Sequence, residues 1–83
     1  MGKTEPESDN RPLREVVAVN VRRARERKNM SVDALARSVG RPREYIEAVE
    51  TAQLPELDAL EIESLAAALD VEESDLIKRG AAQ

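Results

Sequence analysis

The chain of 83 residues has room for one small domain, and it contains neither cysteine nor histidine. This composition excludes disulfides, the usual zinc sites and the common nucleophile–base pairs of enzymes. The net charge of −4 hides an asymmetry, because residues 11–43 carry ten basic and three acidic side chains, whereas residues 44–77 carry eleven acidic and no basic ones. An acidic chain disfavours non-specific binding of nucleic acid, but a basic half suits a local footprint on it.

The first twelve residues of the chain are polar apart from Met1. Residues 1–12 lack the apolar segment of a secretory signal, and no apolar run approaches the ~20 residues that cross a bilayer. We therefore expect a cytoplasmic protein with no membrane partner. Residues 1–12 are predicted to form a disordered arm, residues 13–79 the domain, and residues 80–83 a frayed end after Gly80.

The first predicted helix runs from about Leu13 to Lys28. Val17, Val21 and Ala24 follow one another at helical spacing, with Leu13 one turn earlier, so this stripe should face the core. Asn29 tolerates a left-handed conformation and can end the helix.

Two short helices, about Val32–Val39 and Arg43–Thr51, are predicted next, with a tight turn between them. Ser31 is a good N-cap, and Gly40 stands where a helix often ends in a left-handed residue. Pro42 suits the first position of the second helix. The expected core residues of this pair are Leu35, Val39, Tyr45, Ile46 and Val49.

The last two helices are predicted from about Asp58 to Leu69 and from about Glu73 to Arg79. The first of them has an alternative start at Pro55, but Asp58 and Glu61 have the spacing of a capping box. The residues expected in the core are Ile62, Leu65, Ala66, Leu69, Leu76 and Ile77. Nothing in the pattern indicates a strand.

The stretch from Ser31 to Glu50 resembles the helix-turn-helix of the Cro and phage-repressor-like (xenobiotic-response-element type) family of DNA-binding proteins. That family's pattern is approximately Ser-Gln-Glu-x-Leu-Ala-x-x-Leu-Gly-Val-Ser-x-x-Tyr-Ile-Ser-x-Ile-Glu. The residues that match it outright are Ser31, Leu35, Ala36, Gly40, Tyr45, Ile46 and Glu50. The resemblance covers about residues 13–79 and implies an all-α, five-helix, lambda-repressor-like domain with its helix-turn-helix at the second and third helices. After Glu50 the chain departs from the pattern, because the usual glycine two residues later is Ala52.

The resemblance implies a sequence-specific DNA-binding transcriptional regulator of bacterial or phage type, not an enzyme, acting as a homodimer on double-stranded DNA. The recognition helix, about residues 43–51, would lie in the major groove. Its candidate base contacts are Arg43, Glu44, Glu47 and Ala48, of which Arg43 can grip guanine with two hydrogen bonds. The candidate phosphate contacts are Arg22, Arg23, Ser31, Arg37, Arg41 and Thr51. The resemblance also implies a structural ion pair between Arg25 and Glu50.

An alternative is a protein-interaction module on the same fold that does not bind DNA. The acidic side chains Glu44 and Glu47 on the outward face of the third helix favour this reading, as does Val32 where the family often has glutamine. Its protein partner would bind the acidic surface of residues 44–77. Neither reading requires a cofactor or a metal ion.

Overall fold

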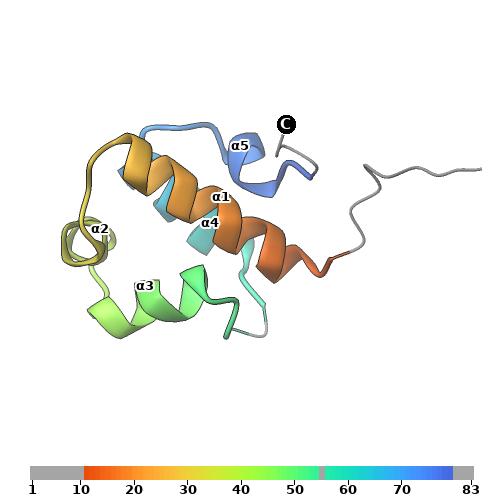
Figure 1. Ribbon diagram of the computed structural model, residues 1–83, viewed down its shortest axis with the longest axis horizontal. Coiled ribbons are helices and arrows are strands. Elements are labelled where there is room, and N and C mark those ends of the chain that lie inside the picture. Colours follow the sequence, from red (N-terminus) through yellow and green to blue (C-terminus); the bar gives the residue numbers. More distant parts are fainter. Residues whose placement is uncertain (1–10, 55, 80–83) are drawn as a thin grey trace, which may run out of the picture.

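Five α-helices follow one another along the chain in the computed structural model, which describes residues 11–54 and 56–79. They are α1 (Leu13–Arg27), α2 (Val32–Val39), α3 (Arg43–Glu50), α4 (Ala59–Leu69) and α5 (Glu73–Ile77). Figure 1 shows α1 passing in front of α4, with α2 and α3 on one side of α1 and α5 on the other. No strand occurs among the described residues, and the predicted all-α class with five helices is confirmed.

The core is aliphatic, as the composition requires, and every helix contributes to it. Leu35, Ile46, Leu65 and Leu76 are almost completely buried, each from a different helix. Burial of one such side chain is worth about 1.5–3 kcal/mol, so a handful of them dominates the stability of so small a domain. The predicted core residues found buried are Val17, Val21, Ala24, Leu35, Ile46, Val49, Ile62, Leu65, Ala66, Leu69 and Leu76.

Four residues predicted for the core, Leu13, Val39, Tyr45 and Ile77, are less buried than expected. Leu13 and Ile77 are each 43% exposed, and Val39 is only partly buried against the edge of the core. Leu13 lies at the very start of α1, and Val16, which was not predicted, is buried one turn further on. Helix α5 has five residues, so it turns only one large side chain inward, and that side chain is Leu76.

Four helices end with the same hydrogen-bonded stop, a Schellman motif around one left-handed residue. After α3, the Gln53 N–H donates to the carbonyl of Ala48 at 2.8 Å and the Ala52 N–H to that of Val49 at 3.2 Å. The same pair of bonds closes α1, α2 and α4. The left-handed residues, the only ones with positive φ in the described part of the chain, are Asn29 (59°), Gly40 (72°), Ala52 (58°) and Asp70 (62°).

The predicted helix ends need small corrections. Helix α1 ends at Arg27 rather than Lys28, and α3 ends at Glu50 rather than Thr51, because in each case the next residue but one is left-handed. Pro42 is the N-cap of α3 and not its first residue. Helix α5 ends at Ile77 instead of Arg79, because Lys78 is already extended.

The start of α4 follows only half of the predicted capping box. Asp58 is the N-cap, and its carboxylate accepts the Glu61 N–H at 2.9 Å. The Glu61 carboxylate, expected to reach back to Asp58, accepts the hydroxyl of Tyr45 instead, at 2.8 Å. This exchange gives α3 a polar link to α4.

The predicted arm and frayed end lie almost wholly outside the described residues, at positions 1–10 and 80–83. The last two residues of the predicted arm are bonded to the domain. The carbonyl of Pro12 accepts the Glu15 N–H at 2.9 Å, and the carbonyl of Arg11 accepts Nη1 of Arg79 at 2.6 Å. In the part of the chain that is described, no helix has the length and apolar character needed to span a membrane.

Replacing Ala52 with glycine is expected to raise the free energy of unfolding by up to about 1 kcal/mol. A left-handed non-glycine residue costs roughly 1–2 kcal/mol, and the greater freedom of glycine in the unfolded chain returns about 0.4–1 kcal/mol of that. The opposite substitution at the equivalent position of α2, Gly40→Ala, should lower the free energy of unfolding by a similar amount. Backbone strain alone would cause this loss, since no atom lies within 4 Å of the added Cβ. Urea denaturation of both variants measures these effects, and a destabilised Ala52→Gly protein would contradict the account.

Candidate nucleic-acid interface

Helices α2 and α3 pack against each other across the turn at Gly40 and present the outer face of α3 to solvent. The Ser31 hydroxyl accepts the Ala34 N–H at 3.0 Å and so caps α2, as predicted. Ile46 and Val49 are buried on the inner face of α3, whereas Arg43 and Glu47 are exposed on the outer face. This arrangement is the geometry in which a recognition helix can enter a groove.

An ion pair between Arg25 and Glu50 anchors α3 to α1, as predicted. Arg25 donates through Nε at 2.6 Å and through Nη2 at 3.0 Å to the two carboxylate oxygens of Glu50. The two side chains are only 14% and 7% exposed, so water screens this pair weakly. The hydrogen bonds to Glu50 raise the pKa of Arg25 above its ordinary value. Nη1 of Arg25 also donates to the carbonyl of Met30 at 2.9 Å, so a single side chain joins α1, the approach to α2 and the end of α3.

Tyr45 fixes the opposite flank of α3. Its hydroxyl donates to Glu61 of α4, and burial together with this hydrogen bond raises the pKa of Tyr45 well above its ordinary value. The phenol therefore keeps its proton and its donor role throughout the physiological range. Tyr45 was expected in the core, but it is only half-buried, and the guanidinium of Arg41 lies 4.5 Å from its ring centre. This distance fits a cation–π contact.

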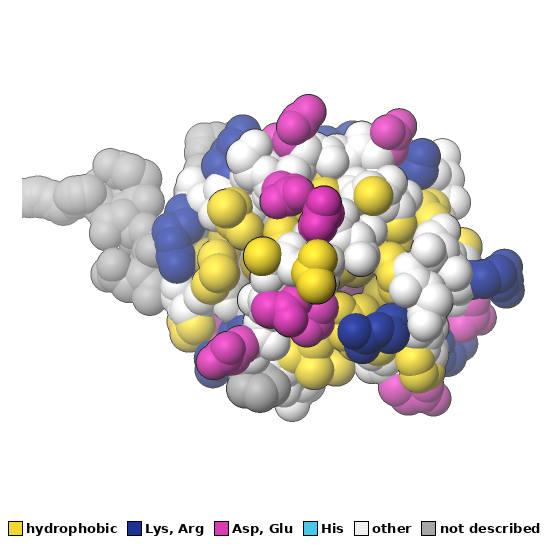
Figure 2. All heavy atoms as spheres, turned by 180° about the vertical axis from the view of Figure 1, so that it is seen from behind, with side chains coloured by type: hydrophobic (Ala, Val, Ile, Leu, Met, Phe, Trp, Pro, Cys, Tyr) yellow, Lys and Arg dark blue, Asp and Glu magenta, His cyan; other side chains and the backbone are white. Residues whose placement is uncertain are grey.

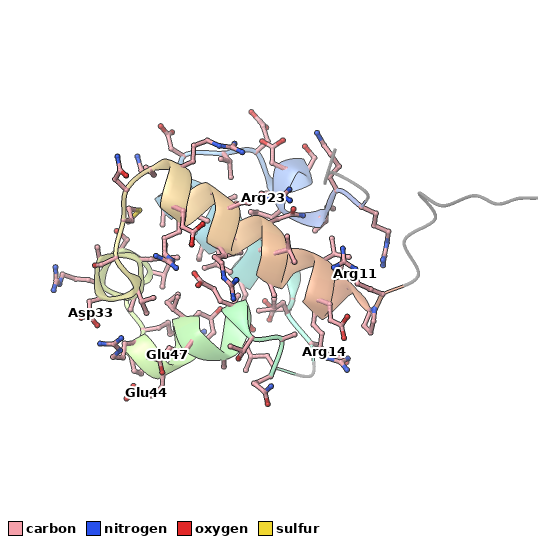
Figure 3. All side chains as sticks on the ribbon, in the orientation of Figure 1. Arg11, Arg14, Arg23, Asp33, Glu44 and Glu47 are labelled. Carbon is pink, nitrogen blue, oxygen red and sulfur yellow. The ribbon has the colours of Figure 1, made fainter. Side chains whose placement is uncertain are left out.

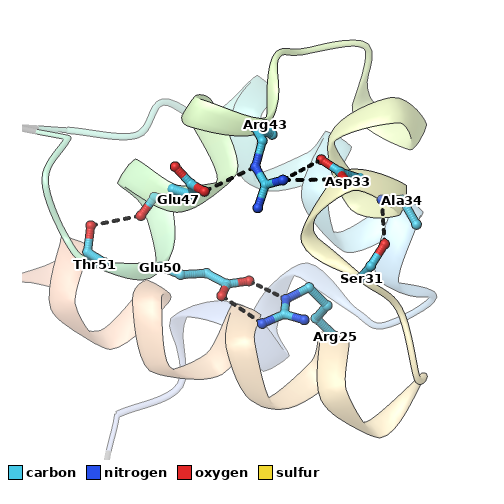
Figure 4. A network of polar contacts seen from close by, with 8 residues as sticks. All are labelled: Arg25, Ser31, Asp33, Ala34, Arg43, Glu47, Glu50 and Thr51. Atoms are coloured by element: carbon cyan, nitrogen blue, oxygen red, sulfur yellow. Dashed lines mark hydrogen bonds and ion pairs between the residues drawn. The ribbon is translucent and has the colours of Figure 1, made fainter.

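Arg43, the leading candidate for a base contact, lies between two acidic side chains (Figure 4). Its Nε donates to Glu47 at 3.1 Å, one turn along α3, and its Nη1 donates to Asp33 of α2 at 3.3 Å. All three side chains are about half exposed. The contact with Glu47 has the i,i+4 spacing that a sequence reveals. The contact with Asp33 depends on how α2 and α3 pack, so it was not predicted from the sequence.

Four other residues predicted for the recognition surface lie in α2, in α3 or directly after α3. Thr51 donates its hydroxyl to the carbonyl of Glu47 at 2.7 Å. Glu44 and Arg37 are exposed, whereas Ala48 is partly buried. Their contacts with bases or phosphates remain predictions.

Arg22 and Arg23 are neighbours in α1, but only Arg22 stands three residues before Arg25 and so shares its face of the helix. Arg23 borders a hollow of about 260 Å³ beside α5, together with Asn20, Asp75 and Lys78. Figure 3 shows Arg23 toward α5, while Asp33, Glu44 and Glu47 lie on the other side of α1. Arg23 is therefore the less favourable phosphate candidate of the two.

Arg14 is a further candidate phosphate contact, and it was not predicted from the sequence. It borders a hollow next to Glu56 and Leu57, in the connection that follows α3, and Figure 3 shows it on the α3 side of α1. Arg14 precedes Arg25 by eleven residues, close to three helical turns, so the two share one face of α1. Because Arg25 pairs with Glu50 of α3, this spacing could have indicated from the sequence that Arg14 also faces α3.

The face behind the view of Figure 1, where α4 is nearest the viewer, has a different character. Figure 2 shows acidic and apolar side chains over its middle, and most of the basic side chains lie toward its edges. Leu60, in the first turn of α4, is 72% exposed.

Comparison with known proteins places the chain among helix-turn-helix domains, which it matches over residues 17–77. It is similar to the crystal structure of a hypothetical transcription factor, NHTF, from Neisseria, with 35% identity and a TM-score of 0.77, covering 95% of this chain and 86% of that one. It is also similar to the restriction-modification controller protein C.AhdI from Aeromonas hydrophila, with 32% identity and a TM-score of 0.71, covering 76% and 94%.

A third structure, the clp gene regulator ClgR from C. glutamicum, is similar in fold alone. Its identity is 22% and its TM-score 0.79, with 87% of this chain and 92% of that one covered. Among proteins whose function has been curated, none matches this chain in sequence.

Proposed function

The chain belongs to the helix-turn-helix domain family, and we propose that it is a sequence-specific DNA-binding transcriptional regulator with α3 in the major groove. The family is one of regulators and not of enzymes. The observation that carries the proposal is the anchoring of α3. A buried bidentate ion pair holds its end on α1, and a tyrosine hydroxyl holds its flank on α4, while its outer face stays exposed. Such a fixed, exposed helix suits base readout.

Two similar structures support this proposal at more than 30% identity. One is described as a hypothetical transcription factor and the other as a controller protein of a restriction-modification system. We transfer from them the general role of transcription control and no particular target sequence.

Affinity and specificity would come from different parts of the surface. The outer face of α3 carries Glu44 and Glu47 beside Arg43, which makes it a poor attractor of phosphates. Basic side chains flanking α3, among them Arg14 and Arg41, would supply the attraction. Helix α3 would then contribute discrimination among base pairs.

We also propose that the protein binds DNA as a homodimer on a two-fold site. Helix α3 has eight residues and is therefore roughly 12 Å long, which lets one copy read only a few base pairs. Two copies, about 34 Å apart, would place two such helices in successive turns of the major groove. Sedimentation of the protein with a selected duplex gives the stoichiometry, and one copy per duplex would refute the dimer.

The test of DNA binding begins with selection from a library of random-sequence DNA duplexes. Binding to the selected duplex is then titrated at about 50 mM and about 200 mM salt. Arg22→Ala or Arg41→Ala should weaken binding to all sequences alike and reduce the salt slope by about 1. Arg43→Ala should cost roughly 1–3 kcal/mol at one base position only. Lys78→Ala, on the α5 side, is the matched control and should change neither the affinity for DNA nor the salt slope.

A second candidate function is favoured by the acidic α3 face and by the acidic and apolar surface over α4. In that case α3 binds a basic protein partner instead of DNA. Charge reversal at Glu44 would then abolish partner binding, whereas its neutralisation should strengthen non-specific binding to DNA under the leading proposal. If the wild type enriches no DNA sequence at low salt, the regulator proposal is wrong and this one takes its place.

A further inference from the structure

Arg43 of α3 is held between carboxylates from two helices, and this arrangement has a consequence for base recognition. We propose that Asp33 and Glu47 are positioning residues that aim the Arg43 guanidinium at one guanine, so that three side chains specify that base pair. The proposal rests on the proposed function, since it presumes that α3 enters the major groove. It adds two specificity-determining residues that would themselves touch no base.

Asp33 and Glu47 do not use the N–H groups of Arg43 that could bind a guanine. Of its five N–H groups, the one on Nε points to Glu47 and one on Nη1 points to Asp33. The two N–H groups of Nη2 and the second of Nη1 do not serve these contacts. Two adjacent donors of this kind match O6 and N7 of guanine.

The two carboxylates come from elements whose relative position is itself fixed. Asp33 is in the first turn of α2, and Glu47 lies one turn along α3 from Arg43. The left-handed turn at Gly40 and the N-cap Pro42 set the angle between the two helices. A long arginine side chain restrained at two of its nitrogens loses less freedom when it meets a base.

The electrostatics indicate a role in discrimination rather than in affinity. Two carboxylates around one guanidinium leave a net negative cluster, which repels the DNA backbone. An arginine serving only to attract phosphates would be better without them. The acids therefore suppress binding where no guanine compensates for the repulsion, which is how specificity is gained at the cost of affinity.

Glu44 provides a matched control on the same helix. It is exposed like Glu47, and within the described residues no contact joins it to Arg43. Neutralising Glu44 changes the charge by the same amount as neutralising Glu47 or Asp33, but it leaves the positioning contacts in place.

The first arm of the test measures sequence preference with the random-duplex library. Wild type should enrich a motif containing a guanine whose preference disappears in Arg43→Ala. The double variant Asp33→Asn/Glu47→Gln should bind unselected duplexes more tightly yet reduce the preference for that guanine by roughly threefold to tenfold, given the strength of two exposed pairs. Glu44→Gln should also tighten non-specific binding, and it should change preference at most at the base pair that Glu44 itself reaches, while the preference for the guanine read by Arg43 is kept. If the double variant behaves like Glu44→Gln, the positioning role is refuted.

The second arm needs no DNA and separates this inference from the proposed function. In the free protein, the Nε–H signal of Arg43 in nitrogen NMR should exchange slowly with water and should sharpen relative to an exposed arginine such as Arg37. Both features should be lost in the double variant and kept in Glu44→Gln. A freely rotating Arg43 in wild type overturns the positioning role even if DNA is bound specifically. A restrained Arg43 without any enriched DNA sequence overturns the guanine readout together with the regulator proposal.

Discussion

Replacing Glu50 with alanine is expected to lower the free energy of unfolding by about 3–5 kcal/mol, the usual loss when one partner of a buried ion pair is removed. Arg25 would keep its bond to the carbonyl of Met30, but its Nε and Nη2 would face a site that is closed to most of the solvent. A small domain has a total stability of only about 5–15 kcal/mol, so the variant should unfold at much lower urea concentration.

Two further variants distinguish the ion pair from other effects at this position. Glu50→Gln keeps the shape of the side chain and one acceptor and should lose less than Glu50→Ala. Glu63→Ala removes an exposed carboxylate from α4 and should change stability by less than about 0.5 kcal/mol. A loss below about 1 kcal/mol in Glu50→Ala would mean that the pair contributes little more than an exposed one.

A second large effect is expected at Asn20, a polar residue that is only 8% exposed. Its amide donates to the carbonyls of Leu76 at 2.9 Å and Lys78 at 3.2 Å, which ties α1 to the end of α5. Asn20→Asp would place a carboxylate against these two carbonyl oxygens. This buried charge should cost up to about 3–5 kcal/mol at neutral pH, because Arg23 and Lys78, which border the same hollow, offset only part of the penalty.

The loss in Asn20→Asp should depend on pH in a defined direction. Burial and the two carbonyls would raise the pKa of the new carboxyl in the folded state above its unfolded value of about 3.9. The folded variant would then bind a proton more tightly than the unfolded one, so the deficit relative to wild type shrinks as pH falls through the folded pKa. Asn20→Ala removes the bonds without adding charge and should lose about 1–3 kcal/mol at every pH. Thermal melts of both variants between pH 4 and about 7 provide the measurement, and equal pH dependence would contradict the proposed cause.

The parts of the structure that the sequence predicted depend on short-range patterns. The helical stripe of Val17 and Val21, the cap at Ser31 and the stops at Asn29 and Gly40 can all be seen within a few residues. The pair between Arg25 and Glu50 spans 25 residues and was predicted only through the family resemblance.

What the sequence could not predict depends on where distant segments meet. The amide of Asn20 reaches carbonyls 56 and 58 residues away, and nothing near Asn20 indicates that α5 will arrive there. The contact between Arg43 and Asp33 likewise requires the angle between α2 and α3. These two contacts shape the end of α5 and the candidate site, where the predictions were least complete.

The Schellman motifs that end α1, α2, α3 and α4 affect how fast this chain can fold. Each is made by residues at most five positions apart, so it can form before any distant segment arrives and its closure costs little chain entropy. The search that remains is to bring a few bounded helices together around Leu35, Ile46 and Leu65. Proteins built from such short-range contacts fold in microseconds to milliseconds. Folding in this protein should therefore be limited by docking of the helices and not by definition of their ends.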